Sequence, residues 1–264
     1  NGVDLHSYQP TADDIVKISD CDLFLYVGGE SEGWVEDALK NATNKDRKVI
    51  NLLDVLGDSV KSEEVVEGMQ EEEHEHEEGE AHEHEEEADE HVWLSLKNAE
   101  VLVGAISNAL QELDAENMEI YAENADAYMK KLAALDAEYQ TAVDNATCKT
   151  VLFGDRFPFR YLADDYALNY YAAFVGCSAE TEASFETISF LAKKADELKL
   201  PCVLTIEGKH HKIAETIVKN TAQKSQRILT MDSMQSTTSK DVASGTTYLS
   251  VMEKNLAVLK EALA

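Results

Sequence analysis

The sequence predicts an α/β protein whose parallel β-strands are covered by helices. Short apolar runs alternate with amphipathic stretches before residue 60, and the same alternation returns after residue 150. Between these two parts lies a helical stretch without proline, from Ser95 to about Asn145. Alternation of strands and helices is typical of parallel sheets, because each helix carries the chain back to the start of the next strand.

The first α/β part is predicted from two apolar runs. Residues 22–29, DLFLYVGG, are interpreted as a buried strand that ends in a glycine turn, and 48–53, KVINLL, as the next strand. A helix that begins at Ser31 and Glu32 separates them. The second part repeats the pattern, with strands predicted at 150–153, 170–174, 202–206 and 227–231, and helices at 185–198, 212–221 and 248–263.

The helical stretch divides into two helices. Ser95 caps the first, and Asp114 caps the second, which we predict over 115–145. Apolar side chains recur in the second helix at spacings of three and four residues, from Tyr128 to Val143. A helix of this length spans roughly 45 Å at 1.5 Å per residue, which is long enough to cross between two lobes.

An acidic insertion interrupts this organisation at 71–90, EEEHEHEEGEAHEHEEEADE. It contains thirteen acids, four histidines and no large apolar residue. Such a stretch cannot bury enough surface to offset the entropy of ordering it, so we expect a mobile loop.

The chain of 264 residues carries a formal net charge of −29. This charge disfavours nucleic acids and anionic membrane surfaces as partners and favours cations. No run of 18 apolar residues is present, so no segment is predicted to span a membrane. Asn1 does not begin a signal peptide and the chain opens inside a motif, from which we expect further residues upstream.

The sequence contains four cysteines without CxxC spacing: Cys21, Cys148, Cys177 and Cys202. We interpret them as small buried apolar side chains. A disulfide between two of the last three is the alternative in an oxidising compartment.

Four of the eight histidines lie outside the acidic insertion. His6 comes just before a helix start marked by Pro10 and Thr11, which fixes the geometry of the loop. His91 is followed by the apolar run VWL, where the chain re-enters a core. The pair at 210–211 is interpreted as the solvated start of a helix.

Four segments carry a family resemblance: HSYQPTADDIVKISDCDLFLYVGGESEGWVEDAL, EHVWLSLKNA, RILTMDSMQS and GTTYLSVMEKNLAVLKEAL. In this order and spacing they resemble the two histidine motifs, the aspartate-bearing strand and the closing helix of the cluster A-I receptors. These are the zinc and manganese solute-binding proteins of ABC importers. An acidic, histidine-rich insertion before the second histidine motif is typical of the zinc members.

The resemblance implies two α/β lobes, each with a parallel sheet flanked by helices, joined by one long rigid helix, with the metal in the cleft between the lobes. We accordingly expect the N-terminal lobe at 1–113, the linking helix at 114–146 and the C-terminal lobe at 147–264. The family's first strand and helix usually precede the first histidine motif, which agrees with the abrupt start.

The resemblance also implies a set of metal ligands. His6, His91 and Asp232 match three of the family's ligands. Two imidazoles and a carboxylate suit Zn²⁺, which takes nitrogen and oxygen donors in a tetrahedron, whereas Mn²⁺ prefers more oxygen ligands. The histidine-rich insertion favours zinc, and manganese is the alternative.

The fourth ligand departs from the family pattern. In FGDRFPFRYLADDYAL, Arg156 stands where the family has a histidine or glutamate, and a guanidinium cannot ligate a metal. We predict Asp155 as the fourth ligand. The alternatives are water, Glu207, His210 or His211, and Asp155 would then form a structural ion pair with Arg156.

The function that these features favour is an extracytoplasmic receptor, periplasmic or anchored as a lipoprotein, that captures zinc and delivers it to ABC permease subunits. We expect a monomer. We expect no catalysis, because no HExxH or nucleophile motif occurs. A surface adhesin on the same fold and a manganese receptor are the alternatives. The acidic insertion is interpreted as a low-affinity zinc collector, because HEH places imidazoles beside a carboxylate; a solubilising segment is the other interpretation.

Overall fold

The computed structural model describes the chain except for residues 1–4, 41, 71–86, 179–181 and 209–210. Its helices are α1 (Ala12–Asp20), α2 (Val35–Lys40), α3 (Leu52–Leu56), α4 (Leu96–Leu113), α5 (Met118–Asp144), α6 (Arg160–Asp165), α7 (Phe185–Glu197), α8 (Lys212–Asn220), α9 (Ser239–Ala243) and α10 (Tyr248–Ala262). Its strands are β1 (Leu23–Tyr26), β2 (Lys48–Asn51), β3 (Thr150–Phe157), β4 (Asn169–Val175), β5 (Cys202–Thr205) and β6 (Arg227–Thr230). Short 3-10 helices are η1 (Leu5–Ser7), η2 (Glu30–Glu32), η3 (Gly57–Ser59), η4 (Val92–Leu94) and η5 (Ala115–Asn117). In the described ranges, no helix combines the length and the apolar character needed to cross a membrane.

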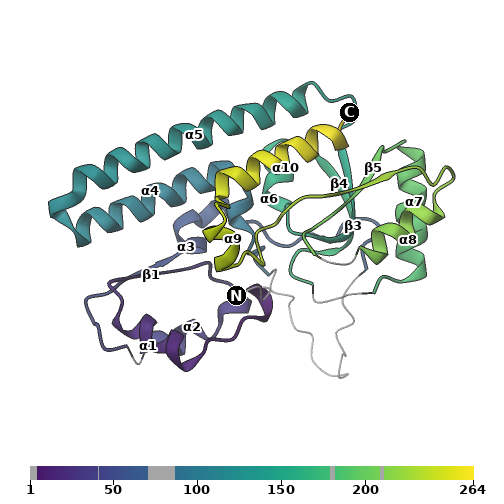
Figure 1. Cartoon of the computed structure of the whole chain (residues 1–264). Coiled ribbons are helices and arrows are strands. Elements are labelled where there is room, and N and C mark those ends of the chain that lie inside the picture. Colours follow the sequence, from purple (N-terminus) through teal and green to yellow (C-terminus); the bar gives the residue numbers. More distant parts are fainter. Residues whose placement is uncertain (1–4, 41, 71–86, 179–181, 209–210) are drawn as a thin grey trace.

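The strands form two separate sheets (Figure 1). β1 pairs with β2, and the larger sheet has the order β4-β3-β5-β6. Every strand pair is parallel, because each connection returns the chain through a helix: α2, α6, α7 or α8. The predicted α/β class with parallel sheets flanked by helices is therefore confirmed.

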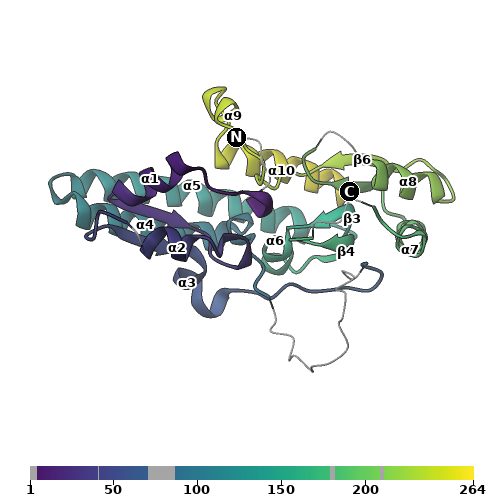
Figure 2. The ribbon, with the colours of Figure 1, turned by 90° about the horizontal axis from the view of Figure 1, so that it is seen from below.

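The 27-residue helix α5 lies antiparallel to α4 and beside α10 (Figures 1 and 2). The hydroxyl of Tyr139 on α5 donates a hydrogen bond to the carbonyl oxygen of Met252 on α10 at 2.7 Å. The long helix predicted at 115–145 is present, with its first turn formed by η5. Its buried stripe repeats the predicted period and consists of Leu132, Leu135, Tyr139 and Val143.

The apolar run at 48–53 forms a shorter strand than predicted. β2 ends at Asn51, whose side chain accepts a hydrogen bond from the backbone N–H of Asp54 at 3.2 Å. That cap starts α3 at once, so Leu52 and Leu53 are helical. A continuous apolar run has no period of its own to mark such a change.

Most of the acidic insertion, residues 71–86, lies outside the described residues. The structure differs from the predicted loop at 87–90, where the N–H of Asp89 donates to the carbonyl oxygen of Lys61 at 2.8 Å. The residues Asp89 and Glu90 are only 2% and 7% exposed. Both carboxylates contact histidine rings, which gives these buried groups polar partners.

The core beneath the larger sheet is aromatic. Phe153 on β3 is fully buried, and its ring centroid lies 5.1 Å from that of Phe157 and 5.4 Å from that of Phe159. Phe157 in turn stacks on Tyr170 of β4, with 3.8 Å between centroids. This cluster fixes β3 and the edge strand β4 against each other and so fixes the positions of the loops that follow them.

All four cysteines are unpaired thiols. Only one of them, Cys202 on β5, is buried, and the other three are half-buried. The disulfide alternative is therefore not formed in this structure, and the interpretation as buried apolar side chains fits Cys202 best.

Candidate metal site

His6 lies on η1, which is followed after a short loop by α1. The start of α1 holds this segment, because Thr11 is the N-cap and exchanges a reciprocal pair of hydrogen bonds with Asp14. The Tyr8 hydroxyl donates to the same carboxylate at 2.8 Å. The helix start predicted at Pro10 and Thr11 is confirmed, and it fixes the backbone that follows the histidine.

His91 is fully buried and comes directly before η4. Oδ1 of Asp89 accepts a hydrogen bond from the backbone N–H of His91 and faces Nδ1 of its ring, both at 2.8 Å. Downstream, the Trp93 indole donates to the Ser233 carbonyl oxygen at 2.9 Å, and the Tyr248 hydroxyl donates to the Trp93 carbonyl oxygen at 2.7 Å. His91 is therefore held on backbone that is anchored to the C-terminal part of the fold.

The two rings direct their Nε2 atoms at each other across 3.1 Å. Nδ1 of His6 lies 3.2 Å from Oγ of Ser31 and 3.4 Å from Oε2 of Glu90, to which the Ser31 hydroxyl donates. Because both Nδ1 atoms face oxygen acceptors, we assign the protons to Nδ1, which leaves a lone pair on each Nε2. Two such lone pairs repel unless a cation lies between them. Two nitrogens bound to one tetrahedral zinc at about 2.0–2.1 Å lie about 3.3 Å apart, close to the spacing found here.

Glu90 supports His6 through a glycine turn after β1. At Gly29, which has φ of +93°, a Cβ would lie 2.4 Å from Oε1 of Glu90, so a side chain there would displace the carboxylate. The N–H of Ser31 donates to the same oxygen at 3.0 Å. Burial alone would raise the pKa of Glu90, but hydrogen bonds with His6 and Ser31 outweigh burial and hold that pKa below its ordinary value. Glu90 is therefore ionised beside the imidazole.

Cys177 is the third side chain at this point. In the described part of the chain, His6, His91 and Cys177 form a group whose ligand atoms all lie within 4.8 Å of one another. Burial, reinforced by the neighbouring Glu63 carboxyl, raises the pKa of the Cys177 thiol. Sequence reasoning missed this residue, although FVGC places it just after a strand, at the edge where ligands gather in open α/β sheets.

Asp155 and Arg156 lie on β3, where its register against β4 shifts. The N–H of Arg156 donates to the Asp155 carboxylate at 2.9 Å, and Nη1 donates to the Ser178 carbonyl oxygen at 3.3 Å. Burial raises the pKa of Asp155, although N–H groups of Arg156 and Ile206 partly oppose it. Asp155 is not a member of the three-residue group, and its place as a ligand stays a prediction.

Asp232 and Glu207 follow β6 and β5. Glu207 accepts hydrogen bonds from the N–H and hydroxyl of Ser233 at 2.7 and 2.8 Å, and from the N–H of Gln235 at 3.1 Å. Asp232 accepts from the N–H of Met234 at 2.8 Å, and burial raises its pKa. Both carboxylates order the loop after β6. Neither belongs to the three-residue group, so Asp232 as a ligand also stays a prediction.

The two remaining alternatives are adjacent histidines. His210 lies outside the described residues. His211 comes directly before α8, and its Nδ1 is buried without a hydrogen-bond partner among the residues that the structure describes. It does not join the three-residue group.

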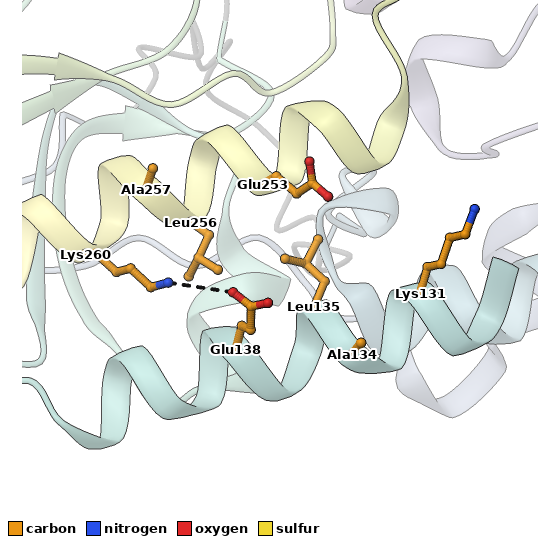
Figure 3. Close-up of a pocket in the computed structure, with 8 residues that line it drawn as sticks. All are labelled: Lys131, Ala134, Leu135, Glu138, Glu253, Leu256, Ala257 and Lys260. Carbon is orange, nitrogen blue, oxygen red and sulfur yellow. Dashed lines mark ion pairs between the residues drawn. The ribbon is translucent and has the colours of Figure 1, made fainter.

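A groove of about 460 Å³ lies between α5 and α10, and none of the candidate ligands lines it (Figure 3). Lys260 and Glu138 form an ion pair across it at 3.7 Å. Its lining contains no histidine or cysteine and shares no residue with the three-residue group: Lys131, Ala134, Leu135, Glu138, Glu253, Leu256, Ala257 and Lys260. The groove therefore lacks the nitrogen and sulfur donors that a zinc site needs.

Known proteins resemble the chain along nearly its whole length. The chain is 33% identical over 260 residues to the zinc-binding lipoprotein AdcA of Streptococcus pneumoniae serotype 4, a match that covers 98% of this chain and 49% of AdcA. It is 32% identical over 263 residues to the high-affinity zinc uptake system protein ZnuA of Bacillus subtilis, covering 100% of this chain and 78% of ZnuA. The chain thus spans about half the length of the streptococcal relative.

Solved structures show the same fold. The Zn(II)-bound ZnuA-like domain of Streptococcus pneumoniae AdcA matches 99% of this chain and 87% of its own, with a TM-score of 0.72 and 29% identity. The metal-dependent lipoprotein YcdH of Bacillus subtilis matches 99% and 87%, with a TM-score of 0.76 and 27% identity. The resemblance found in the sequence is confirmed. A family model described as zinc-uptake complex component A, periplasmic, matches residues 1–262, and the chain belongs to this family.

Proposed function

We propose that this chain is an extracytoplasmic receptor that captures one zinc ion and delivers it to the permease subunits of an ABC importer. The observation that carries the proposal is the convergence of the His6 and His91 Nε2 atoms at 3.1 Å, with a carboxylate behind each Nδ1. Relatives named as zinc-binding and zinc-uptake proteins support zinc as the ion, and the name lipoprotein supports a location outside the cytoplasm.

The receptor acts by binding rather than by catalysis. Each imidazole offers a neutral Nε2 to the ion, while Asp89 and Glu90 orient the rings and make the nitrogens more basic. Imidazoles favour zinc over manganese, which prefers oxygen ligands. We place the site between two lobes, 1–113 and 147–264, joined by a linking helix at 114–146, a division supported by the two separate sheets.

A metal titration of the chelator-stripped chain tests the proposal. We expect one tight zinc site by calorimetry and a much weaker response to manganese. A manganese affinity equal to or above that of zinc would favour the manganese receptor instead. Absence of any tight metal site would leave an interaction protein on this fold as the better reading, and would refute the receptor.

Replacing Asp89 with asparagine is expected to weaken zinc binding by about 10–100-fold, because the substitution keeps the shape of the side chain but removes the charge behind His91. The measurement is a competition titration against a chromophoric zinc chelator. The matched control is Asp164→Asn, which removes a half-exposed carboxylate paired with Lys61 at 2.6 Å and should leave the affinity unchanged. Equal affinities for wild type and Asp89→Asn would show that the carboxylate does not support the site.

Replacing Gly176 with alanine is expected to weaken zinc binding by about tenfold, because metal sites respond strongly to misplaced ligands. The added Cβ would lie 2.9 Å from Cε1 and 3.0 Å from Nδ1 of His91, so the ring must move. The same titration measures the effect. The control is Gly104→Ala on α4, where a Cβ meets no atom within 4 Å and the affinity should not change. A Gly176→Ala variant with full affinity would contradict the close packing of this turn on the ring.

A further inference from the structure

We propose that the Cys177 thiolate is a protein ligand of the bound ion, so that two imidazoles and one thiolate build the site. The inference rests on the proposed function, because it adds a ligand to the same site. It starts from the three-residue group, in which the sulfur and two ring nitrogens lie within 4.8 Å of one another. This mixture of donors and this spacing suit zinc, which binds thiolate at about 2.3 Å and imidazole at about 2.0–2.1 Å.

The backbone on the N-terminal side of Cys177 packs directly on one of the imidazoles. Gly176 leaves no room for a Cβ, which would lie 2.9 Å from Cε1 of His91 and 3.0 Å from the carbonyl oxygen of Phe157. The residue that follows β4 therefore packs closely against the Cε1 and Nδ1 atoms of the histidine ring. The next residue along the chain is the cysteine, whose sulfur lies within 4.8 Å of a ring nitrogen of each histidine.

Polar contacts hold the turn on both sides of the sulfur. The N–H of Cys177 donates to Oε1 of Glu63 at 2.8 Å, and the thiol also contacts the Glu63 carboxyl and the N–H of Glu90. On the other side, Nη1 of Arg156 donates to the carbonyl oxygen of the buried Ser178 at 3.3 Å. Arg156 thus braces the turn that carries the thiol. A ligand whose position is fixed before the ion arrives loses less entropy on binding.

The bound dication supplies the positive charge that a thiolate needs, because burial and the Glu63 carboxyl beside the thiol disfavour the anion in the metal-free chain. Asp89 and Glu90 already face imidazole nitrogens, and Arg156 adds a permanent positive charge near the turn. An anionic ligand reduces the charge of a dication held by two neutral rings. On binding, the S–H bond of Cys177 breaks, a sulfur lone pair forms the metal bond, and the proton leaves to solvent.

A thiolate changes which ions the site accepts. Soft sulfur donors select zinc and its heavier relatives, whereas manganese is best held by oxygen ligands. Cys177 is therefore a specificity-determining residue of the receptor, and its removal should affect zinc much more than manganese.

X-ray absorption at the zinc edge tests the inference on the full chain loaded with one equivalent of zinc. We expect one sulfur neighbour at about 2.3 Å beside nitrogen or oxygen neighbours at about 2.0–2.2 Å. Cys177→Ser should lose the sulfur neighbour and more than about 100-fold in zinc affinity, since a lost ligand should cost at least as much as a lost supporting contact. Cys148→Ser removes a half-buried thiol outside the three-residue group, so it should keep both the sulfur neighbour and the zinc affinity.

The possible outcomes separate this inference from the receptor proposal. A wild-type spectrum with only nitrogen and oxygen neighbours overturns the role of Cys177, while tight zinc binding in the same sample keeps the receptor. A wild-type chain that binds no zinc overturns both. The wild-type spectrum decides the identity of the ligand without any substitution, so the test stands even if Cys177→Ser does not fold.

Discussion

Zinc is expected to leave the melting temperature of the His91→Ala variant unchanged, while it raises that of the wild-type chain by about 5–10 °C. The rise follows from linkage, because a ligand at about 100 times its Kd stabilises the folded state by about 2.7 kcal/mol. For a chain of this size, each kcal/mol shifts the melting temperature by about 2–4 °C. His91 supplies one of the two converging nitrogens, so its removal leaves the ion without a paired imidazole.

Two further variants make this expectation specific. His6→Ala removes the other nitrogen from a half-buried position on a three-residue helix, so the fold should survive while the zinc response is lost. His211→Ala removes a half-buried histidine outside the three-residue group and should keep the full response. Loss of the response in His211→Ala, with retention in His6→Ala, would place the site elsewhere.

The largest effect on stability is expected from Phe153→Ala, which should lower the free energy of unfolding by about 3–5 kcal/mol. Phe153 is fully buried on β3, and its ring packs against two other aromatic rings, so truncation leaves a cavity that the neighbouring strands cannot fill. Denaturant unfolding of the metal-free chain, followed by circular dichroism, measures the change.

Phe185→Ala is the matched control for this measurement. Phe185 begins α7 and is 79% exposed, so its truncation removes little buried surface and should change the free energy of unfolding by less than about 0.5 kcal/mol. Similar losses for the two variants would mean that the aromatic cluster of β3 does not form the core of the larger sheet.

Much of the fold could be predicted because its signals are local. The strands at 150–153 and 202–206 are apolar runs bounded by polar residues, and the helix at 115–145 shows its period over many turns. The run at 48–53 does not form one strand, because the Asn51 side chain accepts a hydrogen bond from the N–H of Asp54, which ends β2 and starts α3. Such a cap competes with strand pairing inside a run whose composition is uniform.

The candidate site was only partly predictable, because its members come from distant parts of the chain. His6 and His91 each precede a helix start that the sequence marks, so both can be predicted as ligands, although their 3.1 Å contact depends on the whole fold. Cys177 carries no spacing signal, and its approach depends on how β4 ends against the His91 ring. The burial of Asp89 and Glu90 could not be predicted either, because both are acidic residues that continue the acidic insertion before them.

The two imidazoles differ in how firmly the chain holds them. The His91 side chain is 0% exposed, and both its ring and its backbone contact Asp89. The His6 side chain is 12% exposed and lies on a helix of three residues. An ion held by several ligands dissociates stepwise, and the first metal–ligand bond to break is the one whose ligand lies on the least stable backbone segment. We therefore expect the residence time of the cargo to depend on the opening of the short helix at Leu5–Ser7, which leaves the buried donors in place for the next ion.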